Sequence, residues 1–245
     1  MNPLLRLRLA IAFLTRVPVG DPIASDQDFA ASLGYFAIVG AAIGVLLSGT
    51  AWLLAPHLPP TVIAGLLLAI SAAITGGLHL DGLADVFDGL GGGRGDANRM
   101  LEIMRDSRIG SHGAVALIVY SLLKLAVLTP LVDSASFVAI ASAPAVARAL
   151  LVPLIIAVPY ARAKGLGTAF QAHAGFTEFL LATCAIAASI AIGGQGTAIA
   201  CAVAAGAMAL FTALIVSKIR GLTGDGYGAL IELGELAFLT AILWH

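Results

Sequence analysis

Apolar stretches long enough to cross a membrane recur along the whole chain, separated by short polar connections. A spanning helix needs about 20 consecutive apolar residues. Seven stretches approach this length, at residues 29–55, 61–80, 111–132, 135–158, 176–193, 197–217 and 226–244. The first follows Ser25-Asp26-Gln27-Asp28, which matches a capping box at a helix start. The pattern predicts an all-α, polytopic membrane bundle of about seven transmembrane helices.

The segment before these stretches, residues 1–25, is too short and too charged to span. It predicts an interfacial amphipathic helix over residues 3–20, with Arg6, Arg8 and Arg16 at the lipid headgroups. With no repeat or soluble domain in the sequence, we expect residues 1–245 to form a single transmembrane domain surrounded by membrane lipid. A homo-oligomer of such domains stays open.

Basic residues divide the connections into two classes. Eleven of the 13 Lys and Arg residues lie outside the predicted spans, all on one side: Arg6, Arg8, Arg16, Arg94, Arg99, Arg105, Arg108, Arg162, Lys164, Lys218 and Arg220. The intervening connections, at 56–60, 133–134 and 194–196, carry none. By the positive-inside rule, the basic side and the N-terminus face the cytoplasm.

Composition agrees with a membrane protein. The 245 residues are 60% hydrophobic and 11% charged, whereas a soluble domain is about 25% charged. The mean hydropathy is +1.00. The formal net charge is −1 with no strongly basic face, so we expect no nucleic-acid partner. Cys184 and Cys201 lie in separate apolar stretches and are expected to be small core residues.

Polar chemistry concentrates in residues 79–112, which we expect to form a cytoplasmic, Asp-rich catalytic loop. Asp81, Asp85 and Asp88 are spaced i, i+4 and i+7, which places three carboxylates on one helix face. Like charges in this arrangement repel unless cations intervene. Solvated helix ends with caps are the plainer interpretation.

A second acidic pair supports a metal site. Glu102 and Asp106 repeat the i, i+4 spacing after a glycine-rich connection. Two acidic faces meeting around metal ions suit phosphoryl transfer, and Mg²⁺ prefers oxygen ligands that it often shares with substrate phosphates. The predicted Mg²⁺ ligands are Asp85, Asp88, Glu102 and Asp106.

The same segment holds groups suited to phosphate. Five glycines between residues 89 and 95 would let backbone N–H groups approach an anion, although the spacing is not a Walker A motif. Arg105 and Arg108 are predicted to bind phosphate oxygens. His79 and His112 bracket the segment and are candidates for substrate binding or proton relay, with a polar anchor at the membrane interface as the alternative.

Two cations, Lys124 and Arg148, lie inside predicted spans, where unpaired charge is costly. Arg148 is roughly two to three turns from the cytoplasmic end and is a candidate for binding an anionic ligand. Asp225, Glu232 and Glu235 fall near one helical face at the start of the last span. They would either balance the two cations or bind a polar substrate group.

Four runs of sequence together resemble a known family. They are FLTRVP at 13–18, HLDGLADVFDGLGGG at 79–93, LEIMRDSRIGSHG at 101–113 and GLTGDGYGALIELGE at 221–235. In this order, over nearly the whole chain, they resemble the cobalamin synthase (adenosylcobinamide-GDP ribazoletransferase) family. The resemblance implies a multi-pass enzyme of the bacterial cytoplasmic (inner) membrane that needs Mg²⁺. It would join adenosylcobinamide-GDP to α-ribazole or α-ribazole 5′-phosphate and release GMP.

The resemblance also implies a mechanism. The metal ions would bind the diphosphate and neutralise charge on the departing GMP. The ribazole 5′-hydroxyl would attack the phosphorus attached to cobinamide, and Asp106 or Asp81 would take its proton. Arg105 and Arg108 would steady phosphate oxygens.

Three other functions stay open. A CDP-alcohol phosphotransferase has a signature that begins as Asp85-Val86-Phe87-Asp88-Gly89 does here, but its Ala-Arg pair is absent and Glu102-x3-Asp106 comes four residues early. A membrane prenyltransferase also uses paired Asp-rich motifs with Mg²⁺. A transporter is the non-enzyme alternative, although most of the acidic residues lie in one connection and not in mid-membrane.

Overall fold

The computed structural model describes residues 2–20 and 23–244, and this part of the chain is helical, with no strand. Its helices are α1 (Pro3–Leu14), α2 (Asp26–Ala31), η1 (Ser32–Tyr35), α3 (Phe36–Leu54), α4 (Pro60–Thr75), α5 (Leu78–Gly92), α6 (Ala97–Ile103), α7 (Ser111–Asp133), α8 (Phe137–Ala157), α9 (Leu166–His173), α10 (Phe176–Ile219) and α11 (Gly224–Ile242). The prediction of an all-α bundle is confirmed.

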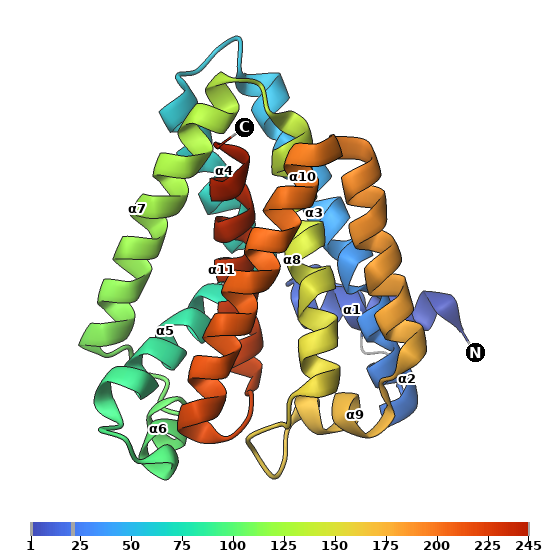
Figure 1. The fold of residues 1–245 in the computed structure, drawn as a ribbon, viewed down its shortest axis with the longest axis vertical. Helices are drawn as coiled ribbons and strands as arrows, with labels where there is room; N and C mark the ends of the chain where they lie inside the picture. Colours follow the sequence, from blue (N-terminus) through green and yellow to red (C-terminus); the bar gives the residue numbers. More distant parts are fainter. Residues whose placement is uncertain (1, 21–22, 245) are drawn as a thin grey trace.

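The long helices run along the length of the molecule, and the short ones gather at one end (Figure 1). The continuous stretch Asp26–Leu54 (α2, η1 and α3) and helices α7, α8 and α10 are each long and apolar enough to cross a membrane. Helix α4 joined to α5 forms a fifth, bent candidate. Near its middle, α10 reverses direction at Gly194, whose φ is +71°, and forms two limbs that match the predicted spans 176–193 and 197–217. The count of seven spans stays a prediction.

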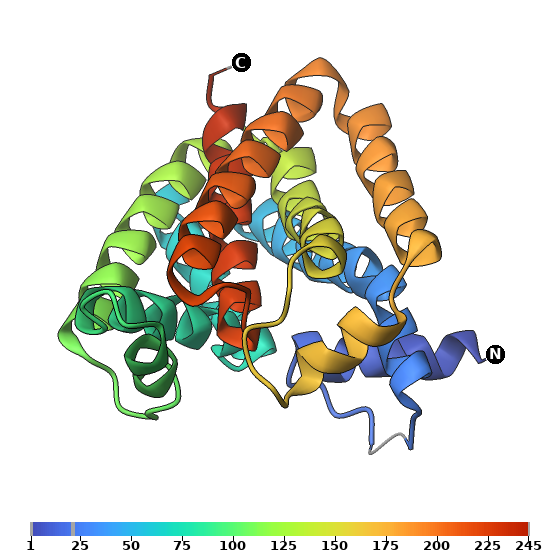
Figure 2. The same cartoon turned by 60° about the horizontal axis from the view of Figure 1, so that its bottom comes forward.

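The N-terminal segment begins with the expected helix, but α1 ends at Leu14, earlier than residue 20. Of the predicted interfacial segment 1–25, residues 1, 21 and 22 lie outside the described residues. Ser25 caps α2 as predicted, because its Oγ accepts the backbone N–H of Asp28 at 3.1 Å. Figure 2 shows α1 crossing the same end of the bundle as α9.

Aromatic packing fixes this crossing. The ring of Phe170 in α9 lies 5.5 Å from that of Phe13 in α1 and stacks 4.7 Å from that of Phe29 in α2. Phe36, at the start of α3, stacks on Phe13 at 5.5 Å. Four aromatic side chains therefore dock the N-terminal segment onto the bundle and set the position of the residues that follow α1.

A sharp corner between α4 and α5 creates the polar end. Gly76 and Gly77 both have positive φ, at +63° and +71°, a backbone conformation that favours glycine. The two helices meet at 90°, so α5 leaves the direction of α4 and runs across the lower part of the bundle (Figure 1). The three aspartates of α5 follow residue 80, where the predicted span 61–80 ends, so they lie outside the spans predicted from sequence.

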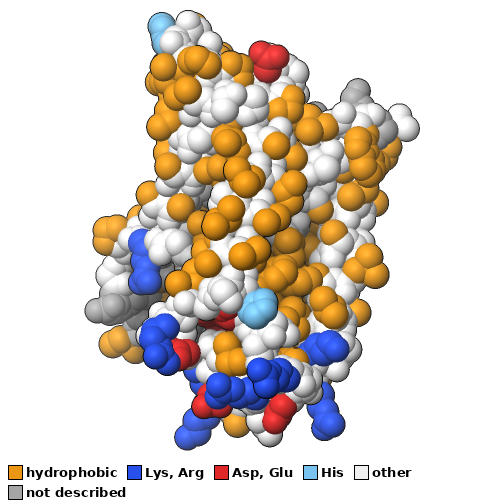
Figure 3. All heavy atoms as spheres, turned by 90° about the vertical axis from the view of Figure 1, so that its left-hand side faces the viewer, with side chains coloured by type: hydrophobic (Ala, Val, Ile, Leu, Met, Phe, Trp, Pro, Cys, Tyr) orange, Lys and Arg blue, Asp and Glu red, His pale blue; other side chains and the backbone are white. Residues whose placement is uncertain are grey.

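Charged side chains gather at this end. The face in Figure 3 shows Lys, Arg, Asp and Glu clustered below a broad apolar band, with only an isolated acidic and a histidine side chain at the opposite tip. The polar end holds the N-terminal segment, α5, α6, the loop after α8 and the loop before α11. Chain segments that are far apart in the sequence thus meet at one surface.

Candidate active site

A cavity of about 430 Å³, here called the polar cavity, opens among these segments. Its polar side chains are Thr15, Arg16, His79, Asp81, Tyr160, Arg162, Lys164, Asp225 and Tyr227. Three cations and two carboxylates therefore face one space. Runs 13–18, 79–93 and 221–235, three of the four that carry the family resemblance, each contribute to it.

Arg16 is held by the corner between α4 and α5. Its backbone N–H donates to the carbonyl of Ile74 at 2.8 Å. A Cβ at Gly76 would lie 2.2 Å from the Cγ of Arg16, so the glycine leaves the space that this side chain crosses. The corner that redirects the chain into α5 also brings Arg16 to the cavity.

Arg162 and Asp225 form an ion pair across the cavity wall, with Nη2 and Oδ2 2.7 Å apart. Their loops are joined by backbone hydrogen bonds. Ala161 N–H donates to the Leu222 carbonyl at 2.7 Å, and Leu222 N–H donates to the Pro159 carbonyl at 2.8 Å. The loop after α8 is therefore fixed to the start of α11 and places its basic residues beside an acidic one.

Glycines let α5 and α11 cross closely. A Cβ at Gly82 would lie 2.6 Å from the backbone oxygen of Asp225, and one at Gly228 would lie 3.0 Å from the Cα of His79. Backbone therefore packs directly on backbone at this crossing. Asp225 and His79 reach the cavity because these two positions have no side chain.

Asp85 lies one turn beyond Asp81 on α5 and is half-buried. Its pKa is raised from 3.8 to about 7, first by burial and then by the neighbouring charges of Asp81, Asp225 and Asp88, while Arg162 lowers it. Burial disfavours the charged form of this carboxyl group, and repulsion from the three neighbouring carboxylates adds to that effect. A bound cation would relieve this repulsion.

Behind the cavity, His79 contacts a buried ion network. Its Nδ1 lies 3.5 Å from Nη2 of Arg148. Arg148 pairs with Glu235 at 2.8 Å, and Lys124 pairs with both Glu235 at 2.8 Å and Glu232 at 3.0 Å. Glu232 and Glu235 thus balance the two buried cations. Arg148, predicted to bind substrate, is 1% exposed and lies behind the cavity.

A second cavity of about 480 Å³, the acidic cavity, lies on the other side of α5. Its charged and polar lining residues are Asp88, Arg99, Glu102, Asp106, Arg108, Ser111 and His112. Asp88 is buried there and accepts the backbone N–H groups of Gly110 at 2.7 Å and Gly113 at 2.8 Å. Its carboxylate therefore caps the first turn of α7.

The other two carboxylates of this cavity are paired with arginines. Asp106 lies 2.6 Å from Arg108, whose hydrogen bonds lower the pKa of Asp106 to about 2. Glu102 lies 2.7 Å from Arg99, and both are exposed. The expected i, i+4 helix face is wrong for Glu102 and Asp106, because α6 ends at Ile103.

The four predicted metal ligands are therefore divided. Asp88, Glu102 and Asp106 line the acidic cavity, whereas Asp85 belongs to the charge cluster beside the polar cavity. Within residues 2–20 and 23–244, no three His, Cys, Asp or Glu side chains converge into a ready metal site. The carboxylates near Asp85 have the right chemistry for Mg²⁺, which takes few protein ligands and shares phosphate oxygens.

The predicted catalytic loop is mostly helical. Residues 89 to 92 complete α5, where a Cβ at Gly89 would lie 2.7 Å from Met104 and one at Gly91 would lie 2.4 Å from the His112 ring. These glycines form a packing surface for α6 and α7. Arg105 is exposed beyond the end of α6.

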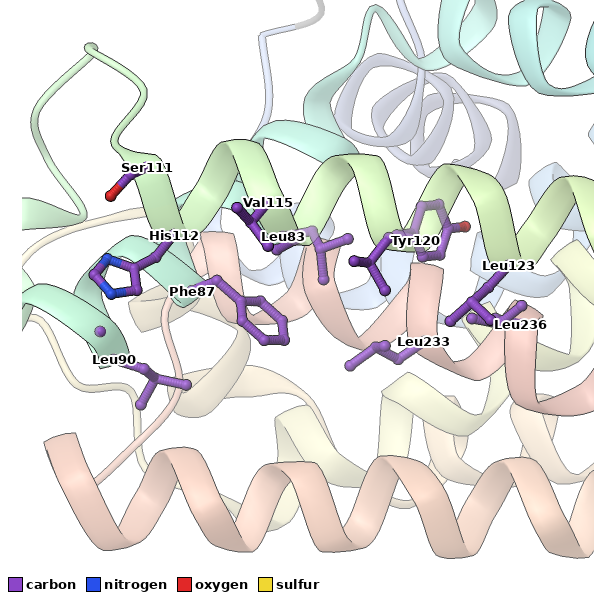
Figure 4. Close-up of a pocket in the computed structure, with 13 residues that line it drawn as sticks. Leu83, Phe87, Leu90, Ser111, His112, Val115, Tyr120, Leu123, Leu233 and Leu236 are labelled. Carbon is purple, nitrogen blue, oxygen red and sulfur yellow. The ribbon is translucent and has the colours of Figure 1, made fainter.

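An apolar groove of about 810 Å³ continues from the acidic cavity, with Ser111 and His112 lining both. Figure 4 shows Phe87 and Leu90 of α5, Leu123 of α7 and Leu233 of α11 around this groove, with His112 at one end. Tyr120 also lines it. The groove offers apolar contact beside a charged opening.

Sequence reasoning missed several residues of the polar cavity. Arg16 was assigned to lipid headgroups, and Arg162 and Lys164 were used only for topology. Tyr160 lies outside the resembling runs, whereas Arg16 and Tyr227 lie inside two of them, which is the available signal for these two residues. The buried hydroxyl of Tyr227 has no hydrogen-bond partner among the described residues.

Comparison with known proteins gives a consistent result. Residues 6–243 match the family described as cobalamin-5-phosphate synthase. A protein of Desulfitobacterium hafniense (strain Y51) is 38% identical, covering 98% of this chain and 96% of its own length. Others from Ectopseudomonas mendocina (strain ymp), 37% identical, and Klebsiella pneumoniae (strain 342), 38% identical, each align with 96% of this chain and 97% of their own lengths. All three are named adenosylcobinamide-GDP ribazoletransferase. No solved structure gives a significant match.

Proposed function

Because the chain belongs to the cobalamin-5-phosphate synthase family, we propose that this transferase uses the substrates for which its relatives are named. It joins adenosylcobinamide-GDP to α-ribazole or α-ribazole 5′-phosphate. The bond between the cobinamide-bearing phosphorus and the bridging oxygen breaks, and GMP leaves with that oxygen. The cobinamide phosphoryl group moves to a hydroxyl of the ribazole, which loses its proton. The polar cavity, where three of the family-like runs meet, is the observation that carries this proposal.

For the attacking group we propose a ring hydroxyl of the ribose in place of the 5′-hydroxyl expected from the resemblance. An acceptor that already carries a 5′-phosphate has no free 5′-hydroxyl. If one mechanism serves both acceptors, the nucleophile is a ring hydroxyl of the ribose. The 5′ position then stays free to carry or lack a phosphate.

The cations of the polar cavity bind the diphosphate. Arg16, Arg162 and Lys164 all line it, and guanidinium groups match phosphate oxygens through paired hydrogen bonds. Arg162 is aimed by its ion pair with Asp225. Fixed donors of this kind stabilise negative charge as it develops on the leaving phosphate.

Mg²⁺ fits best beside Asp85. The carboxylates of Asp85 and Asp225 repel each other, and a shared divalent ion would remove that repulsion. When bound there, Mg²⁺ would neutralise the diphosphate. Asp88 is committed to capping α7, and Glu102 and Asp106 are paired with arginines, so we leave these three out of the metal site.

Asp81 is the better placed of the two predicted bases. It is exposed in the polar cavity, facing the cations that bind phosphate. Asp106 lies in the other cavity, and its pKa of about 2 makes it a poor proton acceptor at neutral pH. We therefore assign the proton of the attacking hydroxyl to Asp81.

The test is GMP release by purified protein in lipid or detergent. With adenosylcobinamide-GDP, α-ribazole and Mg²⁺, GMP should appear, and it should stop when EDTA is added or the acceptor is omitted. Labelled isoprenyl diphosphate and CDP-alcohol serve as rival substrates. No GMP from folded protein would overturn the proposed reaction.

Matched arginine variants locate the site. Arg162→Gln removes a cation from the polar cavity, and Arg108→Gln removes one from the acidic cavity. We expect the first to lower kcat/KM by at least a hundredfold and the second by less than tenfold, since buried charge contacts to phosphate contribute about 3 kcal/mol. The reverse order would move the active site to the acidic cavity.

A further inference from the structure

The buried network behind the polar cavity spans three helices. Lys124 comes from α7, Arg148 from α8, and Glu232 and Glu235 from α11. All four are at most 4% exposed. Tyr120 joins at the far side, accepting a hydrogen bond from Lys124 at 2.6 Å and donating one to Glu232. The two positive and two negative charges cancel.

Arg148 is aimed by several fixed contacts. Its Nη1 donates to the carbonyl of Pro144 at 3.0 Å and to Glu235 at 2.8 Å. Glu235 is held from its other oxygen by Lys124. Its Nη2 lies 3.5 Å from Nδ1 of His79, and its Nε has no hydrogen-bond partner among the described residues. The orientation of the guanidinium therefore depends on Glu235 and, through it, on Lys124.

The contact between Arg148 and His79 determines the proton position on the imidazole. A guanidinium has only donors, so Arg148 must donate and Nδ1 of His79 must accept. The ring proton then lies on Nε2. A second proton would place an imidazolium directly against a guanidinium, which like-charge repulsion disfavours.

The other face of His79 is available to a ligand. His79 lines the polar cavity, and no side chain or backbone group among the described residues hydrogen-bonds to its Nε2. A neutral imidazole with Nε2–H is a donor and has no free acceptor on that side. It can bind a phosphate oxygen but cannot take the proton of an attacking hydroxyl.

We propose that Arg148 and Glu235 are positioning residues that hold His79 as the Nε2–H tautomer, donating to an anionic oxygen of the ligand in the polar cavity. The identity of that ligand rests on the proposed function, whereas the tautomer does not. A network that served only to hold the helices together would not need to contact His79, a residue that lines the cavity. Apolar side chains of similar volume would pack α7, α8 and α11 together without the free-energy cost of burying four charges.

Nitrogen NMR on the full chain tests this directly. Protein labelled with ¹⁵N-histidine in nanodiscs gives separate shifts for protonated and unprotonated ring nitrogens, and His79→Gln assigns the signal. We expect an unprotonated Nδ1 and a protonated Nε2 in the wild type. A protonated Nδ1, or an imidazolium, at neutral pH would overturn the proposal.

Two glutamine variants separate positioning from general stability. Glu235→Gln and Glu232→Gln each remove one negative charge from the same network, but only Glu235 contacts Arg148. We expect the His79 signals to change in Glu235→Gln, with loss of the single tautomer, and to stay in Glu232→Gln. Unchanged signals in Glu235→Gln, or equal changes in both variants, would overturn the positioning role. Folding is checked for each variant by its elution profile and melting temperature.

The kinetics of GMP release then test whether the position of His79 matters for the reaction. In Glu235→Gln we expect kcat for GMP release to fall at least tenfold, with KM changing less than threefold, because a misdirected donor loses mainly transition-state contact. An unchanged kcat would contradict the positioning role. The NMR measurement needs no substrate. A protein that shows the expected tautomer but releases no GMP would therefore contradict the proposed function and leave the tautomer assignment intact.

Discussion

Asp85 and Asp88 lie on the same helix, three residues apart, in opposite surroundings. Asp88 accepts two backbone N–H groups at the start of α7, whereas Asp85 faces the like charges of Asp81 and Asp225. The carboxylate of Asp88 is therefore stabilised, whereas burial and like-charge repulsion both disfavour the ionised form of Asp85. Repulsion of this kind is common where a site waits for a cation or substrate.

Asp85→Asn should stabilise the protein and remove activity. The pKa of Asp85 is raised from 3.8 to about 7 in the folded state, so its contribution to stability is highest at low pH and is lost as pH rises from about 4 to about 7. The rise in the pKa of Asp85 from 3.8 to about 7 corresponds to about 4 kcal/mol, which solvent screening of this half-buried group reduces to about 1–2 kcal/mol.

Thermal unfolding of both proteins at pH 5 and pH 8 measures this effect. The advantage of Asp85→Asn over the wild type should be larger at pH 8, and Mg²⁺ should stabilise the wild type more than the variant. Asp106→Asn is the control, because Arg108 lowers the pKa of Asp106 and the sign is opposite. A variant less stable than the wild type at pH 8 would contradict the prediction.

Asp88→Asn should have the opposite effect on stability. An amide has one oxygen in place of two, so one of the N–H groups of Gly110 and Gly113 loses its acceptor. The expected loss is about 1–2 kcal/mol in the free energy of unfolding. Denaturant titration at pH 7 checks it, and a gain in stability would assign Asp88 to the metal site predicted from sequence.

At the scale of the elements, the crossing of α5 and α11 sets the distance between Asp81 and Asp225. Gly82→Ala would push a Cβ to 2.6 Å from the backbone oxygen of Asp225, which cannot move aside as a flexible side chain would. We expect a loss of about 1–3 kcal/mol in stability. GMP release should fall as well, because the two helices must separate.

Gly206→Ala in α10 is the matched control. Nothing lies within 4 Å of its added Cβ, so alanine should favour the helix by up to about 1 kcal/mol. The melting temperatures and rates of GMP release of Gly82→Ala and Gly206→Ala are measured and compared. Equal melting temperatures would show that α5 and α11 tolerate a wider crossing.

The sequence predicted elements well where hydrophobic pattern decides them. The start of α2 at Ser25 and the limbs of α10 follow from capping and apolar length. The end of α6 was not predicted from the sequence. The i, i+4 spacing of Glu102 and Asp106 fits a continuous helix, but α6 ends at Ile103. Spacing alone does not reveal where tertiary packing ends a helix.

The site was predicted less completely, for a related reason. The carboxylates in residues 79–112 were predicted as site residues because acidic residues are concentrated there. Their division between two cavities depends on which side of α5 each one faces, and the sequence does not show this. The ion network needs α7, α8 and α11 to be neighbours, so sequence left substrate binding by Arg148 open. Arg162 reaches Asp225 only because their loops pair, across 63 residues.

For the whole molecule, the gathering of charge at one end makes a prediction about membrane orientation. Eleven of the 13 basic residues lie in segments outside the predicted spans on that side, so the polar end should face the cytoplasm. In the proposed reaction, GMP and the nucleotide part of the donor are soluble and charged. The polar cavity must therefore open to the compartment that contains them.

Cysteine labelling of oriented vesicles tests this. In a background where Cys184 and Cys201 are replaced by serine and alanine, Lys164→Cys marks the polar end and Asp133→Cys marks the opposite end, at the last residue of α7. Lys164 and Asp133 are both exposed. An impermeant maleimide should label the Asp133→Cys protein in right-side-out vesicles and the Lys164→Cys protein in inverted ones, while detergent exposes both. The reverse pattern would place the polar cavity outside the cell, away from cytoplasmic nucleotides. Ribazole transfer at that cavity would then be excluded, even though the family assignment would stand.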